Sequence, residues 1–296
     1  MKILGRSDTP GFFLFIMPWL IGFSVFFLVP FGTSIFYAFT DAKLPGSTDF
    51  QFIGLSNFAE MLKNPIFAKS VFNTMYFVVL GVPIVTAGML LLATLLNLKV
   101  KGIALYRTFY YLPTLVPIVA TVIIWRLVFN AEFGILNAIL GLFGVGKVDW
   151  LGGEHTIKPV IILLQIWISG SGVLILLAAL KNVPRHLYEA AEIDGASVVR
   201  RFFSITLPMI SSSILFVLII QTMYNFQMFT EAMLLSKGGP NYASYTFVYN
   251  IYKSAFTDLK FSMAMAQSMF LFVLIALVTT VLMRLSNRYV YNESGN

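Results

Sequence analysis

The sequence contains no cysteine and only two histidines, His155 and His186, which lie far apart along the chain. The absence of cysteine excludes a disulfide framework and a cysteine-based metal site, and two separated histidines do not form a histidine-rich metal cluster. The chain also lacks paired carboxylates and a serine–histidine–aspartate constellation. We therefore expect no catalytic centre, no bound metal and no cofactor.

A complete nucleotide-binding loop is also lacking. The glycine-rich segment 141–147 fits most of a phosphate-loop pattern, but Val148 stands where such a loop needs a serine or threonine to hold magnesium. A phosphate loop also follows a strand, and no strand is expected before this segment. A glycine-rich turn explains the segment better than a nucleotide site does.

Charged residues are scarce as well. They make up 11% of the chain, whereas hydrophobic residues make up 58% and aromatic residues 16%. Soluble domains carry roughly 25% charged residues, so the composition predicts a membrane protein. The net charge of +7 comes from cations that flank apolar runs, which predicts contact with membrane lipid and not with nucleic acid.

Six apolar runs are long enough for a helix to cross roughly 30 Å of hydrocarbon. Prolines lie inside several runs and two-residue alternation is absent, which disfavours a transmembrane barrel. The backbone must then satisfy its own hydrogen bonds in lipid, so we expect an all-α membrane protein. The sequence predicts a single transmembrane domain over residues 1–296, with spans at about 12–39, 70–96, 108–129, 159–180, 204–234 and 262–283.

The first run is longer than a signal peptide and no small-residue cleavage site follows it, so we expect an uncleaved first span. An even number of spans places both termini on one side of the membrane. The loops on that side are short and rich in arginine and lysine, including Lys99, Lys101, Arg107, Arg200 and Arg201. The positive-inside rule therefore predicts that both termini are cytoplasmic.

The most polar stretch between two long apolar runs is 189–208, in the cytoplasmic loop 185–208. Residues up to Asp194 favour a helix, Gly195 favours a helix stop in left-handed geometry, and a second helix can start near Ser197 and run to Pro208. The expected product is a helix–turn–helix knob at the membrane surface. From the residues alone, an amphipathic loop lying on lipid headgroups is an equally good interpretation.

The same stretch resembles a family signature. Glu189-Ala190-Ala191, a glycine six positions after the glutamate and Ile205-Thr206-Leu207-Pro208 are similar to the "EAA" loop of binding-protein-dependent ABC importer permeases. The segments 54–58 (Gly-Leu-Ser-Asn-Phe), 111–113 (Tyr-Leu-Pro) and 238–240 (Gly-Gly-Pro) match as well. The pattern most resembles the carbohydrate-uptake, or maltose-type, branch, and within it the first permease of a pair.

This resemblance implies a six-helix type I ABC importer permease in the inner membrane of a bacterium or archaeon. The implied partners are a second homologous permease, two cytosolic ATPase subunits and an external solute-binding protein that delivers a sugar. The resemblance assigns ATPase coupling to the EAA loop, with these residues: Glu189, Ala190, Ala191, Asp194, Gly195, Arg200 and Arg201. Import of glycerol phosphate by the same machine, and a self-sufficient secondary carrier, remain as alternatives.

The fifth predicted span carries polar residues in its second half. Gln221, Tyr224, Asn225 and Met228 follow the spacing of one helix face, which we expect to point to protein or to a water-filled cavity. Amides and an aromatic ring suit a sugar, so this face is a candidate substrate path. Trp167 and Ser171 in the fourth span are candidates for the facing wall. Hydrogen bonding between helices of two permeases is the alternative interpretation.

Overall fold

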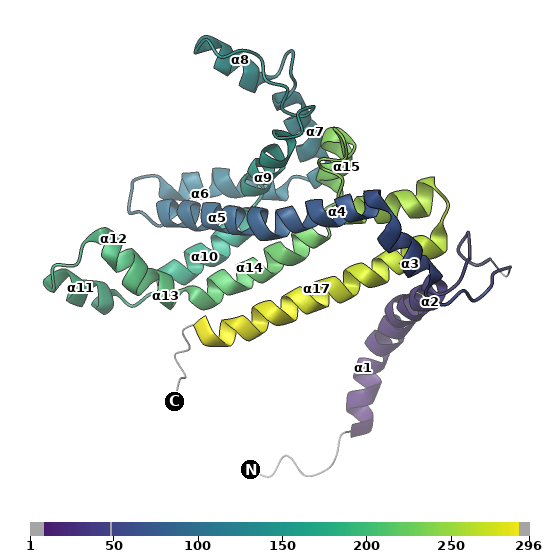
Figure 1. The fold of residues 1–296 in the computed structure, drawn as a ribbon. Helices are drawn as coiled ribbons and strands as arrows, with labels where there is room; N and C mark the ends of the chain where they lie inside the picture. The colour runs from purple at the N-terminus through teal and green to yellow at the C-terminus, as the bar shows by residue number, and fades with distance from the viewer. Residues whose placement is uncertain (1–8, 48, 290–296) are drawn as a thin grey trace. The chain divides into compact units, whose positions relative to one another are not determined.

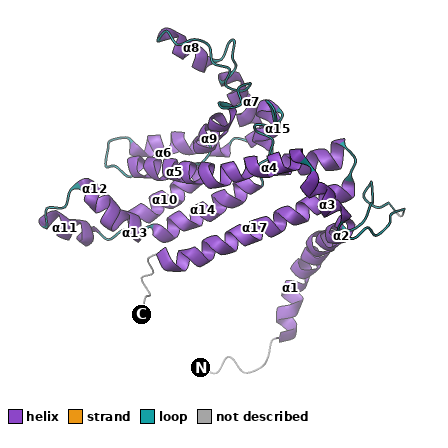
Figure 2. Ribbon diagram, viewed as in Figure 1, coloured by secondary structure: helices purple, strands orange, loops and turns teal. Residues whose placement is uncertain are grey.

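The computed structural model describes residues 9–47 and 49–289, and most of this part is helical (Figures 1 and 2). Within the described residues the only extended pairing is an isolated antiparallel bridge between Thr40 and Phe52. The all-α expectation is therefore confirmed. In the part of the chain that the structure describes, three continuous helices are long and apolar enough to cross a membrane, namely Phe13–Ala38, Pro65–Leu96 and Phe261–Arg284.

These three helices correspond to the first, second and sixth predicted spans. The first consists of α1 (Thr9–Phe23), the π-helical turn η1 (Ser24–Leu28) and α2 (Val29–Ala38). The second consists of α4 (Pro65–Tyr76), the π-helical turn η2 (Phe77–Gly81) and α5 (Val82–Leu96). The sixth is the larger part of α17 (Phe261–Tyr289).

Three π-helical turns each end two residues before a proline. Besides η1 and η2, which precede Pro30 and Pro83, η4 (Phe202–Thr206) precedes Pro208. A proline removes one backbone donor, and its ring collides with the carbonyl four residues earlier. Widening the preceding turn relieves that collision, so the helix continues through the proline.

The other three predicted spans are bent helix pairs. Helix α6 (Ile103–Tyr111) with the 3₁₀ turn η3 (Leu112–Leu115) meets α7 (Ile118–Val128) at 103°. Helix α9 (Ile157–Trp167) meets α10 (Gly170–Asn182) at 54°. The stretch Val198–Met209 meets α14 (Ser211–Phe226) at 69°. Counting each pair as one span gives the six that hydropathy predicts.

The bends and the end of α14 differ from the prediction, which gives each of these spans as one uninterrupted residue range. Pro113 and Pro117 flank the first break, where they withhold two backbone donors. Helix α14 ends at Phe226 and not near residue 234, and a separate helix α15 (Thr230–Ser236) follows after a turn. Hydropathy detects the length of an apolar segment but not the direction of its helix axis. Two helices that meet at an angle therefore read as one apolar run.

The chain divides into two compact units. The first comprises residues 1–63 and 251–270 and includes α3 (Ser56–Lys63), the π-helical turn η5 (Lys253–Thr257) and the beginning of α17. Its parts are joined by buried side chains. The Asn57 Nδ2 atom donates to the backbone oxygens of Ala38 at 2.9 Å and Thr40 at 2.7 Å, and the hydroxyls of Thr40 and Ser262 lie 3.1 Å apart.

The second unit comprises residues 64–250 and 271–296, and its core is formed by α5 packed against α9, α10 and α14 (Figure 1). Val85, Met89, Leu176 and Val217 are fully or almost fully buried there. Gly172 allows α10 to approach closely, since a Cβ at this position would lie 2.6 Å from the Met89 sulfur. The remaining helices of this unit are α8 (Ile135–Leu142), α11 (Arg185–Ile193), α12 (Val198–Arg201), α13 (Leu207–Met209) and, at its boundary, α16 (Phe247–Tyr252).

Candidate functional site

The predicted coupling segment folds as two short helices around a glycine turn. Helix α11 ends in a Schellman arrangement, in which the Ala196 N–H donates to the Ala191 oxygen at 2.9 Å and the Gly195 N–H donates to the Glu192 oxygen at 3.1 Å. Gly195 has a φ of 73°, the left-handed geometry expected of a helix stop. The predicted turn at Gly195 is therefore confirmed.

The second helix starts where the sequence predicts. The Ser197 hydroxyl accepts a hydrogen bond from the Arg200 N–H at 3.3 Å and so caps α12, which continues through η4 and α13 to Met209. Two contacts fasten the helices together. The Arg201 guanidinium lies 3.4 Å from the Glu192 carboxylate, and the Tyr188 and Thr206 hydroxyls lie 2.7 Å apart.

The tip of this segment exposes apolar side chains as well as charges. Ile193 is 88% exposed, Val198 72% and Val199 66%. Of the predicted coupling residues, Glu189, Ala190, Asp194, Gly195 and Arg200 are exposed, whereas Ala191 and Arg201 are half-buried against the two-helix turn. An apolar tip rimmed by charges fits a surface that a partner covers.

The predicted polar face of α14 is split between the interior and the surface of the second unit. Asn225 is fully buried, and its Oδ1 atom accepts a hydrogen bond from the Gln165 Nε2 atom of α9 at 2.9 Å. Its own Nδ2 atom donates to the Gln221 backbone oxygen at 2.9 Å. Gln221 is half-buried and Tyr224 is exposed. Asn225 therefore fastens α14 to α9 within one chain.

Met228 does not lie on the helix face that its spacing predicts. Because α14 ends at Phe226, Met228 lies in the following turn, where it is buried and its sulfur is 3.3 Å from the Gln165 Nε2 atom. Sequence reasoning missed Gln165. A single amide within the apolar run 157–167 is the signal that could have identified it, since such a group requires an internal partner.

A second buried polar contact holds Tyr224. Its hydroxyl donates to the Glu231 carboxylate of α15, and Glu231 is buried. Helix α15 packs against α7. The contact fixes the orientation of the Tyr224 ring while leaving part of that ring exposed. Glu231 is the second residue that the sequence interpretation left without a role.

Trp167 and Ser171, the predicted facing wall, lie on either side of the break between α9 and α10. Both are exposed. The Trp167 ring packs edge-on against Trp125 of α7, with 5.9 Å between ring centroids. The break leaves Ser171 in the first turn of α10, where Gly170 lies against Thr114 of η3. These residues thus belong to a surface where two bent spans meet.

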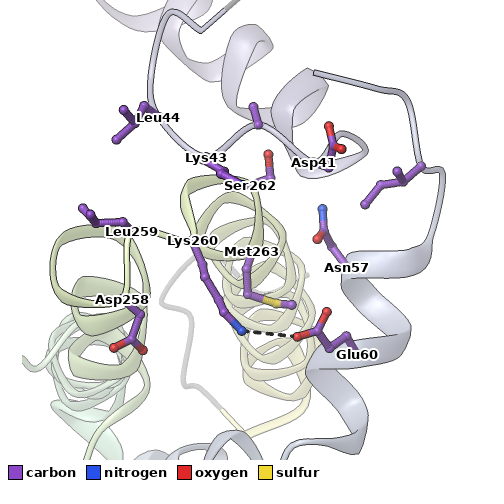
Figure 3. Close-up of a pocket in the computed structure, with 12 residues that line it drawn as sticks. Asp41, Lys43, Leu44, Asn57, Glu60, Asp258, Leu259, Lys260, Ser262 and Met263 are labelled. Carbon is purple, nitrogen blue, oxygen red and sulfur yellow. Dashed lines mark ion pairs between the residues drawn. The ribbon is translucent and has the colours of Figure 1, made fainter. Parts of the chain in front are cut away.

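The first unit contains a separate cavity of about 590 Å³, shown in Figure 3. Lys260 and Glu60 form an ion pair across it, with 3.5 Å between nitrogen and oxygen. Its other polar groups are largely engaged: Asp41 accepts from the Gln51 N–H at 2.6 Å, and Asn57 and Ser262 hold the unit together. The cavity therefore lies where the 39–63 segment meets the start of α17, and most of its polar groups already have partners within the protein.

The family described as the binding-protein-dependent transport system inner membrane component matches residues 52–291. The chain belongs to this family. Its apolar helices are therefore those of an inner-membrane transport component.

Curated relatives extend over nearly the whole chain. A probable ABC transporter permease protein, YesP of Bacillus subtilis, is 38% identical over 294 residues, covering 98% of this chain and 94% of the relative. The arabinooligosaccharides transport system permease protein AraP of Bacillus subtilis is 33% identical over 94% of this chain and 88% of its own length. The sn-glycerol-3-phosphate transport system permease protein UgpA of Yersinia enterocolitica is 32% identical, with 96% and 98% covered.

A solved structure has the same fold. A chain of a bacterial ABC transporter involved in the import of the acidic polysaccharide alginate aligns with a TM-score of 0.83 at 24% identity, covering 96% of this chain and 98% of that chain. The six-span importer permease fold is therefore the fold of this protein.

Proposed function

We propose that this chain is the transmembrane permease subunit of an ATP-driven importer, and that the importer takes up a sugar or oligosaccharide delivered by an external solute-binding protein. The observation that carries the proposal is the exposed helix–glycine–helix knob at 185–208 in a chain of this family. The permease AraP, named for arabinooligosaccharide transport, supports the choice of substrate class.

In this proposal, the coupling segment transmits ATPase movement to the spans. Glu189, Ala190, Ala191, Asp194 and Gly195 form the part inserted into a cytosolic ATPase subunit, and Arg200 and Arg201 form its basic flank. The ion pair and hydroxyl contact within the knob make it a rigid body, so a displacement of α11 reaches α14 through α12, η4 and α13. ATP hydrolysis belongs to the partner subunits.

We place the sugar path along the surface formed by α9, α10 and α14 of the bent spans. Trp167, Tyr224 and Ser171 provide exposed aromatic and hydroxyl groups, and Gln221 provides a half-buried amide, which together suit a sugar. Asn225 and Met228 belong to the wall of this path, which they position through their contacts with Gln165. A second homologous permease completes the path, and both termini of this chain lie in the cytoplasm on the positive-inside rule.

Reconstitution tests the proposal. The complex with its partner permease and ATPase subunits is placed in vesicles, and uptake of labelled arabinooligosaccharide is measured with binding protein outside and ATP inside. We expect uptake only when all components and ATP are present. Uptake by this chain alone, without ATP, would establish a secondary carrier and refute the proposal.

Glycerol phosphate import is the second candidate, because the UgpA relatives cover almost the full chain at similar identity. The two candidates are distinguished by competition in the same vesicles. Unlabelled oligosaccharide abolishes the labelled sugar signal if the first candidate holds. ATP-dependent uptake of labelled sn-glycerol 3-phosphate, with no sugar uptake, would establish the second.

A further inference from the structure

Two lysines of the second unit lie together at the starts of two spans. Lys69 is on the first turns of α4, which begins at Pro65, and Lys158 is the second residue of α9. The Lys158 Nζ atom lies against aromatic rings of α4, the helix that carries Lys69. Successive spans alternate in direction, so the starts of the second and fourth spans are on the same side of the membrane, which the positive-inside rule predicts to be the external side.

Aromatic rings of α4 hold the Lys158 side chain over this helix. Its Nζ atom lies 4.5 Å from the centroid of the Tyr76 ring and 5.5 Å from that of Phe72. Lys69, Phe72 and Tyr76 follow a spacing of three and four residues, so they lie on one face of α4. The cation–π contacts therefore bring the charge of Lys158 to the face that carries Lys69.

Neither lysine has an anionic partner in the described part of the chain. No carboxylate there forms an ion pair with Lys69 or Lys158. Glu154, the acid nearest to Lys158 in sequence, instead accepts a hydrogen bond from the Asn241 side chain. Two neighbouring cations with no counter-charge favour an anion that lies between them.

The surroundings of the pair match those of a lipid. Phe72 is 63% exposed, and Val79 and Leu80, which follow along the same span, are exposed as well. Lysines at the end of an apolar span extend their charged groups to the headgroup level, while exposed apolar side chains below them contact acyl chains. A soluble anion would use the cations but not this apolar surface.

We propose that Lys69 and Lys158, with Phe72 and Tyr76, bind the phosphate headgroup of an anionic phospholipid in the external leaflet. The phosphate lies between the two ammonium groups, and an acyl chain follows the exposed face of Phe72. The site is independent of the substrate that the importer carries.

The test uses the complete importer complex in nanodiscs of phosphatidylcholine that contain a minor fraction of phosphatidylglycerol. Native mass spectrometry counts the phosphatidylglycerol molecules retained per complex, and titration of this lipid gives its affinity. A lysine near an anionic headgroup contributes about 1 kcal/mol, so we expect affinity to fall roughly 5-fold in Lys69→Gln and roughly 25-fold in Lys69→Gln/Lys158→Gln. Lys158→Arg keeps the charge and the ring contact, and we expect it to retain the lipid.

The matched control is Lys63→Gln/Lys147→Gln, which removes the same charge from two exposed lysines between predicted spans, the last residue of α3 and a loop residue after α8, both expected on the same side. We expect it to leave lipid retention unchanged. Equal losses of lipid in both double variants would mean that the effect is general electrostatic attraction, and would refute the proposed site. Unchanged lipid retention in Lys69→Gln/Lys158→Gln would refute it too. Displacement of the lipid by excess inorganic phosphate would assign the site to a soluble anion. A loss of affinity for the binding protein alone, with lipid retention intact, would assign it to a protein contact.

Discussion

The knob at 185–208 and the polar cluster around Asn225 are built on opposite principles. Every contact that shapes the knob is local, from the Gly195 turn and the Ser197 cap to the Glu192–Arg201 ion pair. The cluster instead joins Gln165 to residues 60 or more positions away. The knob exposes its apolar tip, whereas the cluster buries its amides.

This difference separates two tasks of a permease. In the proposed function, the local, self-contained knob keeps its shape while it moves as a unit against an ATPase subunit. A buried amide cluster ties two spans together, because breaking it leaves polar groups without partners in an apolar environment. Variants in the knob should therefore affect coupling at constant stability, and variants in the cluster should affect stability first.

The largest effect is expected at the knob. Gly195→Val forces a β-branched residue to a φ of 73°, at a cost of roughly 1–2 kcal/mol at the turn. The valine displaces α11 from α12, so we expect at least a tenfold loss of ATP-dependent uptake with normal membrane insertion. Transport in vesicles and the amount of inserted protein measure the two quantities.

Gly46→Val is the matched control. Gly46 has a φ of 76° and, like Gly195, has no heavy atom within 4 Å of the position that a Cβ would occupy. The substitution therefore imposes the same backbone strain outside the knob. We expect wild-type coupling of ATP hydrolysis to uptake in this variant. A loss of uptake as large as that of Gly195→Val would attribute the effect to strain in general.

The second-largest effect is expected in the polar cluster around Asn225, where substitutions should lower the stability of the protein. Asn225→Ala removes the oxygen acceptor of the buried Gln165 amide and leaves it only the weak Met228 sulfur contact, which costs about 1–3 kcal/mol. We expect a lower midpoint of thermal unfolding for the purified complex. Gln165→Ala should cost a similar amount, and the double variant should cost less than the sum, since the two residues share one hydrogen bond. Additive losses would show that the two side chains act separately.

Local rules explain why the knob could be predicted and the cluster could not. The positions of Gly195 and Ser197 specify a helix stop and a helix start within three residues. The partner of Asn225 depends on the packing of α9 against α14, which no local pattern encodes. The placement of Met228 on the helix face was wrong because neither glycine nor proline marks the end of α14 at Phe226.

The spans likewise have features that local sequence predicts and features that depend on packing. Apolar length predicted six runs; inside them Pro30 and Pro83 follow π-helical turns, and Pro113 and Pro117 lie at the break before α7. The bend of 103° between Ile103–Leu115 and Ile118–Val128 was not predicted, because hydropathy contains no information on the direction of a helix axis. The Tyr224–Glu231 contact was also missed, although a carboxylate near the end of a span signals a buried partner.

The smallest effect is expected at the exposed surface of the bent spans. Ser171→Ala removes one exposed hydroxyl from the first turn of α10 and leaves the buried residues of that helix in place. We therefore expect unchanged thermal unfolding and a change of a few-fold in the concentration of sugar that gives half-maximal uptake. Ser213→Ala, another serine of the second unit, is the comparison. Loss of stability in Ser171→Ala would place this residue among the structural contacts and not in the path.

The most direct test of the account is cross-linking from the knob in this cysteine-free chain. Ala190→Cys, on the exposed face of α11, is labelled with a photoactivatable maleimide in the assembled complex, with Ser171→Cys as the control. The account predicts a cross-link from position 190 to the ATP-hydrolysing subunit, at a yield that changes when ATP is added, and none from position 171. No cross-link from position 190 to that subunit in a complex that still transports sugar would contradict it.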